Sequence, residues 1–187
     1  MVEMYVNDIR NALKNQCYFS ALALSLALPD ICGSTEFPNK SVAERYIGWY
    51  DKYVGEYVKD DNDTIKRPWL SGEMVYNLRN TYLHQGSINI DADKVKEEAN
   101  KVDKFVLLWG NGENIQDMTL TVLFRSVNFR LIMVDVTYLC ELLCECSLEY
   151  YNNNRERFKN NSSIIPQEYL FGDNSPFDDI QSGSDSR

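Results

Sequence analysis

Apolar residues recur at helical spacing through the first part of the chain. In residues 2–28 they follow one another every four positions, and the second half of this stretch is apolar on nearly all sides. This pattern predicts one long central helix. Pro29 and Asp30 are expected to end it, because proline cannot continue a helix, and residues 33–39 have the composition of a loop.

Two further helices are predicted before the middle of the chain. Ser41 is a favourable N-cap for a helix that continues to about Val58 and carries an aromatic face. After a charged loop, Ser71 is the N-cap expected for the next helix, and Gly86 is the residue expected to end it. This third helix is apolar on most sides but carries one stripe of polar side chains, which indicates a chemical role.

The pattern changes after this polar stripe. Two runs rich in β-branched and aromatic residues, Lys104–Trp109 and Leu120–Phe124, predict strands. The turn-like sequence NGEN between them favours an antiparallel β-hairpin at about residues 103–126. Helical periodicity resumes at Phe129 and continues to about Tyr151, which predicts the helix that closes the bundle.

The predicted fold is therefore mainly α, a helical bundle over residues 1–151 with a small antiparallel β-hairpin insertion. With 187 residues, 44% of them apolar, the chain can bury a core as one domain. Residues 152–187 form a polar, acidic tail that we expect to be partly disordered, with Tyr169–Phe171 and Phe177 docking on the bundle or on a partner. The apolar run Phe19–Leu28 is about half the ~20 residues needed to span a membrane, so a buried helix is expected.

Composition narrows the classes of function. A net charge of −9 argues against a broad, non-specific grip on nucleic acid, so any contact with RNA must be local. Five cysteines, an odd number without framework spacing, are expected to be reduced thiols in a cytoplasmic protein. Cys140 and Cys144 share a helical face, but Cys146 points elsewhere and no histidine is nearby, so buried thiols are expected and no metal site. No phosphate-binding loop is evident, and no cofactor is predicted.

The polar stripe contains the only histidine of the chain, His84. Glu73, Asn77, Asn80 and His84 follow at steps of four, three and four residues, so they share one helical face, with Arg79 beside it. Metal-free cleavage of RNA requires a group with a pKa near neutral to move the proton of the 2′-hydroxyl. It also requires a cation for the charge that develops on the phosphate. Histidine and arginine are the side chains that meet these two needs.

The six residues from Arg79 to His84, RNTYLH, resemble the RxxxxH motif of the HEPN superfamily, many members of which are metal-independent ribonucleases. Residues 27–33 (ALPDICG), 45–54 (RYIGWYDKYV) and 70–86 (LSGEMVYNLRNTYLHQG) are together similar to small bacterial HEPN-type proteins. The similarity covers roughly the first half of the chain. It implies a HEPN-like bundle and attack of the 2′-hydroxyl on the adjacent phosphate, which leaves a 2′,3′-cyclic phosphate and a 5′-hydroxyl.

The resemblance also implies roles for individual residues. Arg79 would hold the phosphate, His84 would act as general acid and base, and Asn80 would orient the imidazole or contact the phosphate. Glu73 and Asn77 would support these catalytic residues from the same face. The implied partners are an RNA substrate, a second copy in a homodimer, and an antitoxin or regulatory protein in a toxin–antitoxin, antiphage or stress setting. No membrane partner is expected.

Other interpretations of the same residues stay open. Five residues of separation place Arg79 and His84 ~140° apart on an ideal helix. In a purely structural interpretation, Arg79 pairs with an acid such as Glu73 or Asp51, and His84 caps or packs at the helix end. The protein would then be a non-catalytic HEPN-like dimerisation module or a nucleotide- or partner-binding module, which the net charge favours. A third interpretation is an adaptor that works through the acidic tail.

Overall fold

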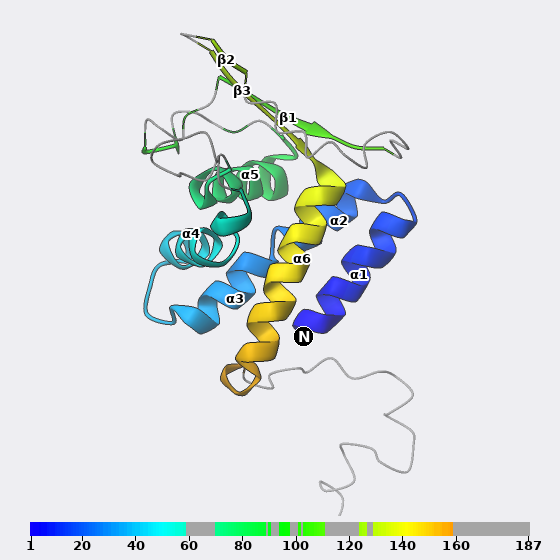
Figure 1. Cartoon of the computed structure of the whole chain (residues 1–187), viewed down its shortest axis with the longest axis vertical. Helices are drawn as coiled ribbons and strands as arrows, with labels where there is room; N and C mark the ends of the chain where they lie inside the picture. The colour runs from blue at the N-terminus through cyan, green and yellow to red at the C-terminus, as the bar shows by residue number, and fades with distance from the viewer. Residues whose placement is uncertain are drawn as a thin grey trace, which may run out of the picture.

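The computed structural model describes residues 1–58, 70–88, 90, 94–97, 101, 103–110, 124–126 and 129–158. The helices among them are α1 (Val2–Lys14), α2 (Tyr18–Ser25), α3 (Leu28–Glu36), α4 (Val42–Tyr53), η1 (Gly55–Val58), α5 (Gly72–Gln85), α6 (Val136–Asn153) and η4 (Arg155–Arg157). The strands are β1 (Lys104–Leu108), β2 (Phe124–Ser126) and β3 (Phe129–Asp135). The small sheet lies at one end of the helical bundle, above α5 and the start of α6 (Figure 1). The prediction of a mainly α fold is confirmed.

The long helix predicted over residues 2–28 is wrong, because this stretch forms α1 and α2 and enters α3. Gln16 adopts a left-handed backbone conformation with φ of 59°, and the N–H of Cys17 donates to the carbonyl of Ala12 at 2.8 Å. These features end α1, as left-handed residues commonly do. The four-residue spacing of apolar positions continues across the break, so periodicity alone did not reveal it.

The sequence around Pro29 starts a helix that we had expected to end there. Pro29 lies in the first turn of α3, where its missing N–H removes no helical hydrogen bond. Gly33, predicted in a loop, lies within α3 because that helix approaches α4 closely. A Cβ at Gly33 would lie 2.5 Å from the carbonyl oxygen of Arg45. The loop predicted from residue 33 therefore begins only after Glu36.

The predicted starts of α4 and α5 and the predicted end of α5 agree better with the structure, whereas α4 ends at Tyr53, short of the predicted Val58, and the separate helix η1 follows it. Ser41 caps α4 in a reciprocal capping box with Glu44. The hydroxyl of Ser71 accepts from the N–H of Met74 at the start of α5, and Gly86 ends α5 in the left-handed conformation with φ of 64°. These local signals were sufficient because a cap depends on residues that are neighbours in sequence.

The strand pairing differs from the predicted hairpin. The strand order is β1-β3-β2, with β1 parallel to β3 and β2 antiparallel to β3. The central strand, β3, falls on residues that we had predicted to begin the last helix. Its sequence FRLIMVD is continuously apolar over four residues and fits a strand as well as a helix, with Ile132 and Val134 buried at a period of two. Most of the predicted loop and second strand, residues 111–123, lies outside the described residues.

β3 continues directly into α6. Asp135 is the last residue of β3 and pairs with Leu108 of β1 in the sheet. Its carboxylate also caps α6 by accepting a hydrogen bond from the N–H of Tyr138 at 2.8 Å. α6 then crosses the bundle and packs on α1, α2 and α3 (Figure 1).

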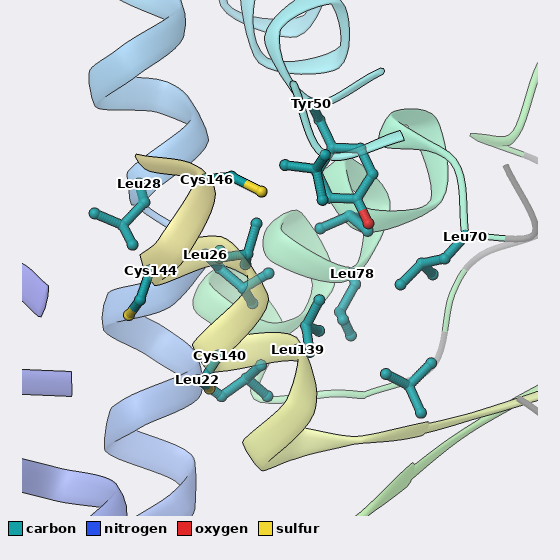
Figure 2. Packing of buried hydrophobic residues seen from close by; sticks show 14 of the residues in the cluster. Leu22, Leu26, Leu28, Tyr50, Leu70, Leu78, Leu139, Cys140, Cys144 and Cys146 are labelled. Atoms are coloured by element: carbon teal, nitrogen blue, oxygen red, sulfur yellow. The ribbon is translucent and has the colours of Figure 1, made fainter. Parts of the chain in front are cut away.

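The core is formed by side chains from all six α-helices and from the inner face of the sheet. Figure 2 shows residues of α2, α3, α4, α5 and α6 converging in this interior. Cys140, Cys144 and Cys146 are buried thiols, as predicted. Cys32 is also buried, whereas Cys17 is exposed. Burial raises the pKa of Cys140 to about 12, so this thiol is protonated and inert at neutral pH.

The structure also bears on the expected tail, metal and membrane features. The tail predicted over residues 152–187 is described only as far as Phe158, and the remainder lies outside the described residues. In the described part of the chain, no group of three or more histidine, cysteine, aspartate or glutamate side chains is arranged to hold a metal ion. None of the described helices has the length and apolar character needed to cross a membrane.

Candidate functional site

α5, which carries the polar stripe, is fixed against α4 at its first turn. The N–H of Gly72 donates to Oδ1 of Asp51 at 2.7 Å. A Cβ at Gly72 would lie 2.8 Å from the carbonyl oxygen of Ile47, so a larger residue would push the two helices apart. This contact sets the direction of α5 and hence the positions of the polar side chains further along it.

The side chain of Arg79 extends from α5 towards the first turn of α3. Its Nη2 donates to Oδ2 of Asp30 at 2.9 Å, and its Nη1 donates to Oδ1 of Asn80 at 2.9 Å. The side chains of Arg79 and Asp30 are 21% and 18% exposed. The acid that pairs with Arg79 is therefore Asp30, and not the Glu73 or Asp51 considered from the sequence.

A second guanidinium shares the carboxylate of Asp30. Nε of Arg45, on α4, lies 3.7 Å from Oδ1 of Asp30, within ion-pair range but too far for a hydrogen bond. Among the residues that the structure describes, Oδ1 of Asp30, Nε of Arg45 and Nε of Arg79 are buried and have no hydrogen-bond partner. We call Asp30, Arg45, Arg79 and Asn80 the Asp30 cluster. Its two guanidiniums and one carboxylate leave one positive charge in excess.

Tyr46 lies close to the Asp30 cluster and is fully buried. Its hydroxyl donates to the carbonyl of Leu26 at 3.1 Å, and its ring centroid is 5.3 Å from that of Tyr76. Burial raises the pKa of Tyr46, and the negative charge of Asp30 raises it further. The cluster therefore lies against apolar, aromatic surroundings, in which charge interactions are stronger than in water.

The Asp30 cluster joins the three segments that carry the sequence resemblance. Asp30 comes from residues 27–33, Arg45 comes from residues 45–54, and Arg79 and Asn80 come from residues 70–86. Sequence reasoning missed Asp30 and Arg45 as site residues. One signal was available for Asp30, because a carboxylate between Pro29 and two apolar residues must find a partner when its surroundings are buried.

His84 lies in the last turn of α5 and is exposed. Because α5 is helical through Gln85, the side chains of Arg79 and His84 start ~140° apart around the helix. Asn80 lies one turn before His84 on the same face. Arg79 donates to Asn80 through one terminal nitrogen, while its other terminal nitrogen donates to Asp30 on α3.

Glu73 and Asn77 make contacts in the first half of α5. The carboxylate of Glu73 accepts from the backbone N–H groups of Lys96 at 2.7 Å and of Glu97 at 3.4 Å. Asn77 is 5% exposed, and its Nδ2 donates to the carbonyl of Glu73 at 3.0 Å. The contacts of Glu73 hold residues 96 and 97 against α5. The supporting role in catalysis that the sequence predicts for Glu73 and Asn77 stays a prediction.

The two side chains of the RxxxxH motif differ in their surroundings. The guanidinium of Arg79 is held by Asp30 and Asn80, whereas the imidazole of His84 is exposed. Comparison of the chain with protein-family models, with curated proteins and with solved structures found no match.

Proposed function

We propose that this chain is a metal-independent endoribonuclease of HEPN type, with Arg79, Asn80 and His84 as its catalytic residues. The observation that supports the proposal is the hydrogen bond from Arg79 to Asn80, one turn before His84. In this proposal, Asn80 turns the guanidinium towards the helical face that carries His84. Cleavage without a metal needs a group that transfers protons and a cation for the charge that develops, and histidine and arginine supply them.

In the proposed reaction, the 2′-oxygen of a ribose attacks the adjacent phosphorus and the bond from phosphorus to the 5′-oxygen breaks. Arg79 stabilises the negative charge that builds up on the non-bridging oxygens. An imidazole removes the proton of the 2′-hydroxyl, and a proton is delivered to the departing 5′-oxygen. In the homodimer that the resemblance implies, two His84 side chains serve these two transfers. The products are a 2′,3′-cyclic phosphate and a 5′-hydroxyl.

A second function, a HEPN-like module that binds a nucleotide or a partner without cutting RNA, is favoured by one specific observation. The guanidinium of Arg79 pairs with Asp30 and is only 21% exposed, so part of its charge is already neutralised. The net charge of −9 also weakens any general attraction for RNA. In this function the exposed His84 plays no part in proton transfer.

Incubation of end-labelled RNA with the pure protein in EDTA tests the proposal. We expect cleavage that leaves 2′,3′-cyclic phosphate ends, and we expect His84→Ala to abolish it without changing the circular dichroism spectrum. Gln85→Ala is the matched control, because Gln85 is the exposed neighbour of His84 in the same turn. Equal cleavage by wild type and His84→Ala would remove the assignment. Binding of a 2′-deoxy oligonucleotide, without cleavage of the matching RNA, would establish the second function instead.

A further inference from the structure

Within the described residues, the Asp30 cluster leaves buried polar atoms of both arginines and of Asp30 without hydrogen bonds, and its two guanidiniums face one carboxylate. Asp30 supplies the one carboxylate, and Asn80 supplies one amide oxygen, which Arg79 occupies. Within the described part of the chain, the side chain of Arg45 has an ion pair with Asp30 at 3.7 Å, and its Nε has no hydrogen-bond partner. Arg45 and Asp30 are 27% and 18% exposed, so the excess positive charge is only partly hydrated.

An excess charge in such surroundings is unfavourable unless an anion balances it. Removing a guanidinium from water costs free energy that a distant or shared carboxylate repays incompletely. The whole chain has a net charge of −9, so an anion would have to be attracted by this local positive charge and not by the chain's overall charge. The cluster is therefore complete only with a further negative group.

We propose that Arg45 and Arg79 together form a binding site for one phosphate group, and that Asp30 is the positioning residue that holds the two guanidiniums side by side. The proposal deepens the ribonuclease function, since it adds Arg45 to the phosphate contact already assigned to Arg79. Arginine suits this task because its planar donors match two phosphate oxygens at once. Asn80 fixes one edge of Arg79 and leaves the guanidinium unable to turn away.

The close approach of α3 and α4 positions the proposed site. Gly33 has no side chain, so the backbone of α3 can lie against the carbonyl of Arg45 on α4. Asp30 is about one helical turn before Gly33 in α3, so this contact brings Arg45 close to Asp30. A phosphate bound there would lie against three helices. The local hydrogen-bond donors of Arg45 and Arg79 would bind it, because a chain with a net charge of −9 offers no general attraction for phosphate.

The test follows the Nε–Hε signals of Arg45 and Arg79 in ¹⁵N-labelled full-length protein during titration. The three probes are inorganic phosphate, adenosine 5′-monophosphate and an uncleavable 2′-deoxy oligonucleotide, and Arg45→Lys and Arg79→Lys assign the signals. We expect both signals to shift together in a saturable manner. Phosphate alone would identify a general phosphate site, whereas shifts with the oligonucleotide alone would identify a phosphodiester site. Titrations in which neither arginine signal moves would overturn the proposal.

Calorimetry on matched variants measures the contribution of Arg45. Arg45→Gln should raise the Kd of the tightest-binding probe by about tenfold or more, because the charge-assisted, bidentate hydrogen bonds of the guanidinium are lost. Arg45→Lys keeps the positive charge but cannot form bidentate hydrogen bonds, so it should bind with intermediate affinity. Arg10→Gln is the control, since it removes the same charge from an ion pair with Glu141 and Glu145 on α6. Equal affinities of Arg45→Gln and Arg10→Gln would show that Arg45 is only structural.

The outcomes separate this site from the ribonuclease. Shifts of both arginine signals in a protein that does not cut RNA would uphold the phosphate site and remove the enzyme. Cleavage of RNA at the same rate by Arg45→Gln and Arg10→Gln, with an unmoved Arg45 signal, would remove the site and leave the enzyme. If Arg45→Gln does not fold, the wild-type spectra alone decide.

Discussion

The two ends of α3 each place a carboxylate against cationic side chains of other helices, yet their hydrogen bonding differs. At the C-terminal end, the carboxylate of Glu36 accepts four hydrogen bonds, from Lys52, Tyr53, Tyr150 and Arg157. At the N-terminal end, counting only the part of the chain that the structure describes, the carboxylate of Asp30 accepts one hydrogen bond, from Arg79, and its second oxygen accepts none.

This difference separates a structural ion cluster from one that retains binding capacity. Burial alone would raise the pKa of Glu36, but its hydrogen bonds from Lys52, Arg157 and the two tyrosines outweigh burial and lower the pKa to about 2. Both oxygens of Glu36 accept hydrogen bonds, and its two cationic partners, Lys52 and Arg157, are about half exposed, so water solvates their charge. The two guanidiniums at Asp30 are less exposed, and within the described residues the Nε of each is buried without a hydrogen-bond partner.

The largest expected effect is on catalysis. Arg79→Gln should lower the rate of RNA cleavage by roughly 10²–10³-fold, the loss typical of removing one donor to a developing oxyanion. Glu36→Gln should change that rate less than twofold, because Glu36 and its hydrogen-bond partners lie at the other end of α3 from Asp30. Initial rates with end-labelled RNA, on protein shown by circular dichroism to be folded, provide the measurement. Equal losses in the two variants would mean that both clusters act only through the fold.

The next largest effect is on stability. Glu36→Ala should lower the free energy of unfolding by about 2–3 kcal/mol, because it leaves two cations and two tyrosine hydroxyls without their shared acceptor. Glu3→Ala is the matched control. Glu3 forms an exposed ion pair with Arg155, so its loss should cost less than about 1 kcal/mol. Urea denaturation of the three proteins measures both changes, and similar costs would contradict the structural role of Glu36.

The low pKa of Glu36 also predicts a pH dependence of stability. A carboxylate with a folded-state pKa of about 2, against an ordinary value of 4.5, contributes stability that is fully present above pH 4.5 and lost as the pH falls towards 2. This contribution is on the order of 2 kcal/mol. Glu36→Gln should lack it, so the difference in urea midpoint between wild type and variant should shrink as the solution is acidified. A constant difference down to pH 2 would contradict this prediction.

The smallest effect on stability is expected at Asp30, near the N-terminal end of α3. Asp30→Asn keeps an oxygen for Arg79 and should lower the free energy of unfolding by only about 1 kcal/mol. Added phosphate should raise the melting temperature of wild type and raise that of Asp30→Asn less, since the variant lacks the carboxylate that holds the two guanidiniums side by side. Differential scanning fluorimetry with sodium chloride of equal ionic strength as control provides the measurement. A phosphate response of Asp30→Asn equal to those of wild type and Glu36→Gln would contradict the positioning role of Asp30.

The sequence predicted those parts of the fold that depend on neighbouring residues. The caps at Ser41, Ser71 and Gly86 were correct because each satisfies backbone groups within a few positions. The break at Gln16 was missed because apolar spacing continues across it. β3 was missed because the apolar residues of FRLIMVD fit both periods, and only its pairing with β1 decides between them.

The candidate site was predicted in part for the same reason. Arg79, Asn80 and His84 lie within six residues of one another, so their helix could be recognised from local sequence. Asp30 and Arg45 join them only through the packing of α3 and α4 on α5, which periodicity does not encode. The ion pair of Arg79 was foreseen as an alternative, but its partner lies 49 positions away in the chain.

The direct passage from β3 into α6 has a mechanical consequence. Asp135 belongs to both elements at once, through its register with Leu108 and its cap on Tyr138, so no hinge separates them. A displacement of β3, for instance by a molecule that binds the sheet, is therefore expected to be transmitted directly to the first turn of α6. α6 touches α3, so such a displacement would reach the helix that holds Asp30 at one end and Glu36 at the other.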